Sequence, residues 1–463
     1  MSVKTKGFAI HWAYILIVAL SLASCKKDDP INLEEAQQIP RSVLTINQFI
    51  YDYMDLGYFW SAEMPKINHK KEPDSEAYFY KLLKQPDDKW SFITDDVEAL
   101  EKYFSGVTKS KGYSIELYRL SANSNQVIAI IEFVYRNTPA EDAGLKRGDI
   151  IYRINGNFLT VENYQELLRL DNMVITLAHI NQSGDATELS PSISISAVQD
   201  LVHHPIVATS VIELGDKKVG YLAYTSFIAN YDNELAGVFR EFKAQGVSEL
   251  VLDLRYNGGG SVNTALMLAE MIAPASAVGD VFIREKWNNN LRGYNEDLKL
   301  KAHAENLNLS RLFVLTTSAT ASASEMIIYG LKPHMEVVQL GETTHGKYYA
   351  SVMLTDNNAD PSKRQHNWAI QPIVLRSENK DNSINYQEGL PPTFALTDNR
   401  YNAQLGEAEE HFLANVLTYI ETGSFPVQET TKSASDNFRS ISGFKDNMDP
   451  LRNVMLTTFP EQR

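Results

Sequence analysis

The second half of the chain alternates short, nearly continuous apolar segments with amphipathic helical segments. Apolar residues dominate Glu249–Leu254, Leu312–Thr316 and Val337–Leu340, as in strands covered by helices on both faces of a sheet. A helix is predicted over 235–242, where apolar residues recur at i, i+3, i+4 and i+7, and Gly246 ends it. This order of strands and helices predicts an α/β fold with a parallel sheet.

The residues before this region follow other patterns. From Ile39 to Phe104 the spacing of apolar and aromatic residues is helical, and prolines divide the region into short helices. From Gly112 to Ala197 short strands alternate with turns, and after Phe425 the chain is polar and aperiodic. The predicted divisions are a helical region at 39–104, a β-rich domain at 105–200, an α/β core at 201–425, and a polar tail at 426–463 that is loosely ordered or drapes over the core.

The amino terminus has the pattern of an export signal. Lys4 and Lys6 precede an apolar run over 8–24, which ends in small residues before Cys25. The segment Leu-Ala-Ser-Cys resembles a bacterial lipobox, which implies lipidation of Cys25, removal of residues 1–24 and a polar tether over 25–38. The alternative is an uncleaved anchor with an incidental cysteine. We therefore expect a lipid-anchored protein of the bacterial cell envelope, on the periplasmic or the surface face of an outer membrane.

Charge and cysteine content exclude several classes of protein. With 58 acidic and 43 basic side chains in 463 residues, the net charge of −15 disfavours nucleic acid as a partner. The single cysteine excludes an internal disulfide and a cysteine-rich metal site. No H-E-x-x-H motif occurs, and the adjacent His203 and His204 would point to opposite faces of a strand. We expect no metal and no cofactor.

A stretch of small residues, Thr320–Glu325, lies where a predicted strand meets a predicted helix. A serine at the start of a helix has backbone N–H groups and the positive end of the helix dipole beside it. Those features suit Ser322 as a nucleophile whose attack creates an oxyanion. The alternative is that Ser322 only caps the helix.

A second stretch, Gly341–Tyr348, nearly matches the phosphate-binding loop G-x-x-x-x-G-K-[ST]. Tyr348 stands where that loop needs a hydroxyl residue that holds magnesium, and the residues that follow alternate like a strand instead of opening a helix. A nucleotide site is therefore not expected here.

Lys347 in this stretch can act as a general base for Ser322. A serine is a weak nucleophile until its proton is removed. A lysine can remove it only when neutral, and burial lowers its pKa from about 10.4 to roughly 7–8. The alternative is a solvated surface lysine.

Three segments together carry a family resemblance: Leu250–Gly260, Ser322–Glu325 and Gly341–Lys347. They resemble the carboxyl-terminal processing (tail-specific) serine proteases, including the separation between serine and lysine. The resemblance implies a crotonase-like (ClpP/crotonase) α/β peptidase core, with Ser322 as nucleophile and Lys347 as base. It also implies an oxyanion hole formed by the amide of Ala323 and that of Gly259, with Gly258 as the alternative glycine.

The segment Thr138–Gly156 is similar to the signature of a bacterial PDZ domain. Such domains capture the carboxyl terminus of a substrate by strand addition and backbone donors. The corresponding peptide-binding loop here consists of Gly112, Tyr113, Ser114 and Ile115. The alternative is that this inserted domain only packs against the core.

Two positions depart from the family pattern. Many relatives carry a glutamine four residues after the lysine, where this chain has Ser351, and a phenylalanine where it has His345. We expect Ser351 to be the third catalytic residue, accepting a hydrogen bond from the amine, directly or through water.

The sequence thus predicts an envelope serine endopeptidase with a Ser-Lys dyad, acting on proteins or peptides with free, unstructured carboxyl termini that a PDZ domain recognises. A homo-oligomer is compatible with this. The alternatives are a catalytically degenerate, lipid-anchored PDZ scaffold that binds peptides, and a crotonase-type acyl transferase.

Overall fold

The computed structural model describes residues 39–181, 183–356, 361–383, 386–399, 401–426, 438–441 and 454–460. The predicted lipidation site Cys25, the signal segment and the tether lie outside these residues. In the part of the chain that is described, no helix combines the length and the hydropathy needed to cross a bilayer.

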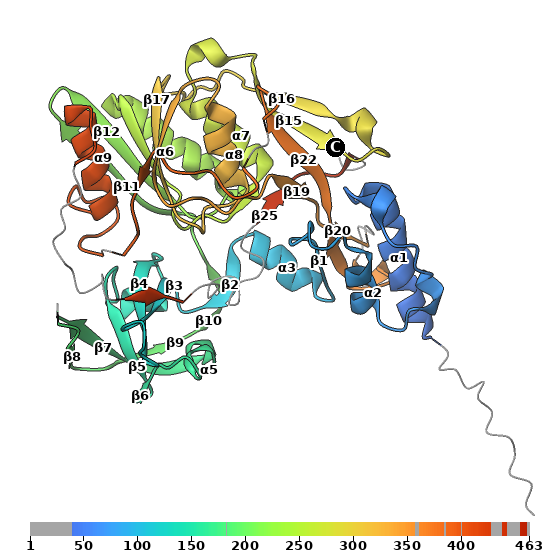
Figure 1. The fold of residues 1–463 in the computed structure, drawn as a ribbon, viewed down its shortest axis with the longest axis horizontal. Helices are drawn as coiled ribbons and strands as arrows, with labels where there is room; N and C mark the ends of the chain where they lie inside the picture. Colours follow the sequence, from blue (N-terminus) through green and yellow to red (C-terminus); the bar gives the residue numbers. More distant parts are fainter. Residues whose placement is uncertain are drawn as a thin grey trace, which may run out of the picture.

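The predicted parallel sheet forms the centre of the α/β core (Figure 1). Its six strands lie in the order β11-β12-β13-β17-β18-β23, and every neighbouring pair except β11–β12 is parallel. The strand bounds are β11 Ile206–Leu214, β12 Lys217–Tyr224, β13 Glu249–Asp253, β17 Arg311–Thr316, β18 Glu336–Gly341 and β23 Phe394–Ala395.

Helices cover both faces of this sheet, as the apolar strands predict. Leu250 and Leu252 of β13 face one hydrophobic cluster with α6, α7 and α8, whereas Val251 faces another with α9. The helix bounds are α6 Asp232–Gln245, α7 Val262–Ile272, α8 Ala323–Leu331 and α9 His411–Thr422. Because the strands are parallel, the loops after β13, β17 and β18 leave the same edge of the sheet.

A second sheet of six strands crosses the end of the core. Its order is β14-β25-β19-β22-β15-β16, with bounds β14 Gly259–Ser261, β25 Val454–Leu456, β19 Tyr349–Ser351, β22 Ile373–Asn379, β15 Val281–Trp287 and β16 Glu296–Lys299. The prediction of a loosely ordered or draped tail is wrong for β25, because this part of the tail is an internal strand and Met455 is fully buried. β25 pairs with β14 on one side and with β19 on the other. These backbone hydrogen bonds hold the segment as a strand, although the sequence around it is polar.

The predicted amino-terminal helices are α1 Arg41–Gly57, α2 Ser75–Leu82 and α3 Val97–Phe104. They are not a separate helical unit, because β1 Phe92–Thr94 pairs with β21 Ala369–Gln371, which also pairs with β20 Leu354–Thr355. Apolar residues of α1, among them Ile50 and Met54, are buried in the main core cluster.

The β-rich domain has a hydrophobic core of its own. Its main sheet runs β24-β3-β4-β5-β7-β8, with β6 and β9 attached, and Figure 1 shows it below the core. The bounds are β3 Tyr113–Arg119, β4 Val127–Val134, α4 Pro139–Asp142, β5 Ile150–Ile154, β6 Asn157–Phe158, α5 Tyr164–Arg169, β7 Asn172–Ile180, β8 Ala186–Glu188, β9 Ile193–Ser196 and β24 Arg439–Ser440. The chain enters through β2 Val107–Ser110 and leaves through β10 Val198–Val202, which pair with each other.

Candidate active site

Ser322 is fully buried at the junction between β17 and α8. Its backbone has φ 65° and ψ −115°, a region that costs a non-glycine residue about 1–3 kcal/mol and is found mostly at functional sites. Its Oγ has no hydrogen-bond partner among the described residues. The hydroxyl is therefore held in place by a strained backbone and is not committed to another group.

Glu325 joins the segment of Ser322 to that of Lys347. One of its carboxylate oxygens, Oε2, accepts the Ser322 N–H at 2.7 Å and the Lys347 N–H at 2.9 Å. The other, Oε1, accepts the Gly346 N–H at 2.7 Å and the Thr344 hydroxyl at 2.5 Å. One buried carboxylate thus brings together the two residues predicted to form the dyad.

Lys347 lies in the interior, with 1% of its surface exposed. Burial is the main cause that lowers its pKa to about 7, and the negative charges of Asp88 and Glu325 oppose this effect. Its ammonium group lies 5.6 Å from the centre of the Trp90 ring. The predicted burial and the predicted direction of the pKa shift are confirmed, whereas no hydrogen bond joins Lys347 to Ser322 Oγ in this structure.

Glu325 also titrates near neutrality. Burial raises its pKa to about 7, although its four hydrogen-bond donors favour the ionised form and oppose that shift. A carboxyl group can accept hydrogen bonds from all four of these donors only when it is ionised, because protonation turns one of its oxygens into a donor. Glu325 and Lys347 therefore change protonation state over the same pH range.

The glycine-rich loop after β13 is fastened by Asn257, which is fully buried. Its side chain donates to the Tyr224 carbonyl at 2.9 Å and accepts the Gly259 N–H at 2.8 Å, and its carbonyl accepts the Ala321 N–H at 3.1 Å. The loop and Ala321, the residue before Ser322, are thus tied together.

These bonds affect the predicted oxyanion hole. The amide of Ala323, in the first turn of α8, has no acceptor within its helix. Gly259 has φ 113° and lies against Ser322, but its N–H is engaged by Asn257. Within the described residues the N–H of Gly258 makes no hydrogen bond, so the alternative glycine is the more accessible donor.

Ser351 lies in β19 and is fully buried. It accepts a hydrogen bond from Gln371 Nε2 at 2.8 Å and donates to the Met455 carbonyl at 3.3 Å. Gln371 Oε1 is buried and has no partner among the described residues. The side-chain amide of Gln371 is therefore hydrogen-bonded to Ser351, which stands where the family pattern has a glutamine.

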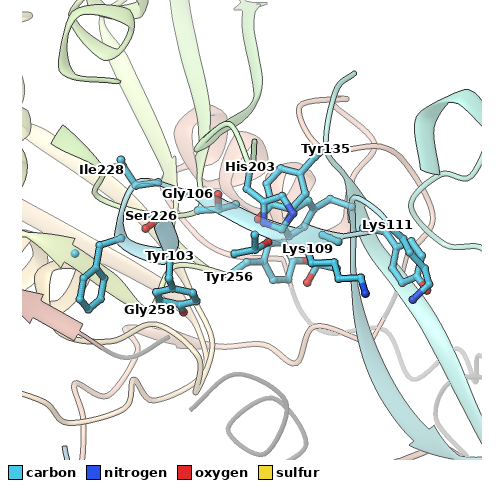
Figure 2. Close-up of a pocket in the computed structure, with 18 of the residues that line it drawn as sticks. Tyr103, Gly106, Lys109, Lys111, Tyr135, His203, Ser226, Ile228, Tyr256 and Gly258 are labelled. Atoms are coloured by element: carbon cyan, nitrogen blue, oxygen red, sulfur yellow. The ribbon is translucent and has the colours of Figure 1, made fainter. Parts of the chain in front are cut away.

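The predicted peptide-binding loop opens onto a cavity of about 570 Å³. Tyr113, Ser114 and Ile115 line it together with Gly258, so one cavity extends from the β-rich domain to the glycine-rich loop (Figure 2). Gly112, the other residue of the predicted loop, is not among the residues that line the cavity; it has φ 91° and no room for a side chain against Thr138. His203 also lines the cavity and is stacked on Tyr135 at 4.3 Å.

Buried charges connect the β-rich domain to the core. Arg147 donates to the Tyr256 hydroxyl at 2.7 Å and to Glu410 at 3.0 Å. Glu410 also accepts from Arg255 at 2.9 Å, and Asp398 pairs with both arginines at 3.4 and 3.2 Å. No cluster of three or more metal-ligating side chains occurs among the described residues.

Three of these residues have no predicted role from sequence. Glu325 belongs to the Ser-Ala-Ser-Glu motif, and Asn257 belongs to the glycine-rich loop, so both could have been found by asking which side chains hold those loops. Gln371 has no local signal, because it reaches Ser351 from another strand, β21.

Three family models match the chain. Residues 218–367 match peptidase family S41, residues 45–92 match the S41 amino-terminal domain, and residues 130–177 match a PDZ domain. These three matches fall on the α/β core, the amino-terminal helices and the β-rich domain, respectively.

Relatives agree with these models. A carboxyl-terminal-processing protease of Synechocystis sp. is 24% identical over 59% of this chain and 64% of its own length. The carboxy-terminal processing protease CtpA of Bacillus subtilis is 27% identical over 46% of this chain and 43% of its own length. The chain thus spans less than two thirds of these curated relatives.

A solved structure covers more of the chain. A crystal structure of a Bacteroides fragilis protein assigned to the S41 proteases has a TM-score of 0.69 and 29% identity, and the match covers 81% of this chain and 97% of that one. The predicted α/β core with an inserted PDZ domain and an amino-terminal helical region is therefore confirmed. Residues 218–367 thus form a peptidase domain of family S41, and the chain also carries a PDZ domain.

Proposed function

We propose that this protein is a serine endopeptidase of the carboxyl-terminal processing type, in which Ser322 and Lys347 form the catalytic dyad. The observation that carries the proposal is the buried amine of Lys347, whose pKa is lowered to about 7 and whose segment is tied to that of Ser322 by Glu325. A base with a pKa close to the working pH is neutral often enough to remove the serine proton.

In the proposed reaction, Lys347 Nζ takes the proton of Ser322 Oγ while Oγ attacks the carbonyl carbon of the scissile peptide. The amides of Ala323 and Gly258 stabilise the oxyanion, and Gly259 serves instead if its bond to Asn257 opens. The ammonium then protonates the leaving amine, which gives an acyl-enzyme. Water attacks the ester with Lys347 again as base, and the carboxylic acid product and the free serine are released.

Ser351 has a supporting part in this proposal. Its bond to Gln371 places an amide near the position of the glutamine found in relatives. We infer that Ser351 and Gln371 together set the orientation of Lys347 by hydrogen bonding.

Substrate capture is proposed to occur at Gly112–Ile115 in the PDZ domain. The shared cavity supports this, because a carboxyl terminus bound at that loop would lie in the same cavity as the glycine-rich loop. Protein or peptide substrates with free carboxyl termini follow from this mode of binding. We further propose that Cys25 carries a lipid anchor that holds the protein in the cell envelope.

The test compares wild-type protein with Ser322→Ala on an unfolded protein substrate. We expect cleavage by the wild type and none by the variant, at similar thermal stability, because alanine keeps the Cβ and therefore the same strained φ. A matched control, Ser324→Ala in the same turn, removes a hydroxyl that donates to the Asn257 carbonyl and should retain activity. Equal turnover by wild type and Ser322→Ala would exclude Ser322 as the nucleophile.

A second candidate function is a PDZ scaffold that binds peptides and has lost catalysis. The absence of a hydrogen bond between Ser322 Oγ and Lys347 in this structure is the observation that favours it. Binding of tail peptides without any hydrolysis by the wild type would establish this alternative.

A further inference from the structure

Strand β25 of the carboxyl-terminal tail lies between β14 and β19 in the second six-stranded sheet. β25 pairs in parallel with β14, with Gly259 opposite Val454 and Ser261 opposite Leu456. On its other side it pairs with β19, where the Thr457 N–H donates to the Ser351 carbonyl at 3.1 Å. Figure 1 shows β25 in red beside β19.

This strand position is adjacent to the nucleophile. A Cβ placed on Gly259 would lie 2.2 Å from the Val454 carbonyl oxygen and 2.8 Å from Ser322 Cβ. The tail carbonyl and the nucleophile therefore approach the same glycine. Val454 and Leu456 also line the cavity that contains the glycine-rich loop.

An earlier part of the same tail occupies the edge of the PDZ sheet. β24 is antiparallel to β3, with Arg439 opposite Arg119, and the Ile441 N–H donates to the Leu117 carbonyl at 3.0 Å. Residues 439–441 run antiparallel to β3, in the direction of its start, where the predicted peptide-binding loop lies. This is the strand-addition geometry by which an extended peptide binds a sheet edge.

Contacts after β25 anchor the tail. Phe459 is 1% exposed and packs against Tyr53 and Trp287, with ring centres 6.2 and 6.1 Å away. The Thr457 hydroxyl donates to Glu285 at 3.0 Å. These contacts hold the tail on the carboxyl-terminal side of Val454.

We propose that residues 438–441 and 454–460 occupy the strand positions that a substrate needs, so that an incoming polypeptide must displace the chain's own tail. This inference rests on the proposed function, because it concerns the same site. Each backbone edge can pair with only one strand at a time, so tail and substrate compete. Competition of this kind raises the apparent KM in inverse proportion to the fraction of molecules in which the site is open.

The first test is Ile441→Pro, which removes the N–H that binds Leu117 and also the Ile441 side chain that packs against the core of the PDZ domain. We expect KM for an unfolded substrate to fall about threefold to tenfold, because the open fraction rises, with kcat unchanged. Phe459→Ala should act in the same direction by loosening the other anchor. Its matched control is Phe239→Ala, an equally buried phenylalanine in α6, which should lower stability without lowering KM.

A binding experiment separates this inference from the proposed function. A fluorescein-labelled synthetic peptide of residues 438–460 is titrated into Ser322→Ala and into Ser322→Ala/Ile441→Pro. Tighter binding to the double variant supports tail displacement even if no variant hydrolyses anything, an outcome that would defeat only the proposed function. Equal binding by both proteins, or an unchanged KM in folded Ile441→Pro and Phe459→Ala, would overturn the inference and leave β24 and β25 as structural strands.

Discussion

At the scale of single residues, Lys347 and Glu325 form a coupled pair in the protein interior. Burial lowers the pKa of the first and raises that of the second, each to about 7. Their effects on stability have opposite signs. Unfolded chains bind more protons at Lys347 between about pH 7 and 10.5, so stability rises with pH there, whereas Glu325 makes stability fall with rising pH between about 4.5 and 7.

The corresponding prediction concerns activity. The proposed mechanism needs a neutral Lys347 and an ionised Glu325, and both forms accumulate as the pH rises through about 7. We expect kcat/KM for a peptide to increase from about pH 6 to about pH 8 with an apparent pKa that belongs to the pair. Lys347→Arg provides the control, because a guanidinium stays charged and should abolish activity throughout. A profile that is flat over this range would contradict the assignment of Lys347 as base.

At the scale of elements, the loop after β13 depends on one side chain. The side chain of Asn257 bonds to Tyr224 of β12 and to Gly259, while its backbone carbonyl accepts from Ala321, the residue before Ser322. Asn257→Ala removes the donor that binds the buried Tyr224 carbonyl. This loss is expected to lower the free energy of unfolding by about 1–3 kcal/mol. The displaced loop should lower kcat by about a hundredfold. Urea unfolding and steady-state kinetics measure both effects, and Asn257→Asp, which keeps the acceptor for Gly259, should retain more activity. Equal kcat values in the wild type and Asn257→Ala would exclude a role for this loop in catalysis.

The elements differ in how well the sequence predicts them. Strands such as Glu249–Asp253 and helices such as α6 follow from local apolar periodicity, and Gly246 ends α6 with φ 76° as predicted. The serine and lysine loops follow from motifs. By contrast, β14 and β25 are short strands far apart in the chain, and neither has a pattern of its own. Their pairing, like the contact of Gln371 with Ser351, depends on tertiary structure that no local window contains.

At the scale of the whole molecule, Arg147 links the PDZ domain to the peptidase core. It donates to the Glu132 carbonyl in its own domain at 2.7 Å, and to Tyr256 and Glu410 across the interface. Tyr256 lies two residues before Gly258, so the interface is continuous with the loop that we propose for the oxyanion. Movement of the PDZ domain and the position of that loop are therefore expected to be coupled through buried hydrogen bonds.

The prediction from this network is that Arg147→Met destabilises the protein and lowers kcat. Removing Arg147 leaves Arg255 as the one positive charge that pairs with the buried Glu410 and Asp398 among the described residues, which is expected to cost about 3–5 kcal/mol of unfolding free energy. The matched control is Arg153→Met in the same domain, since Arg153 pairs with the exposed Glu188 and its loss should cost less than about 1 kcal/mol. Urea unfolding measures the stability of both variants, and the kcat for a short peptide shows whether the oxyanion loop has shifted. If Arg147→Met behaved like Arg153→Met in both measurements, the buried charges would not couple the two domains, and the PDZ domain would act only as an independent site for substrate capture.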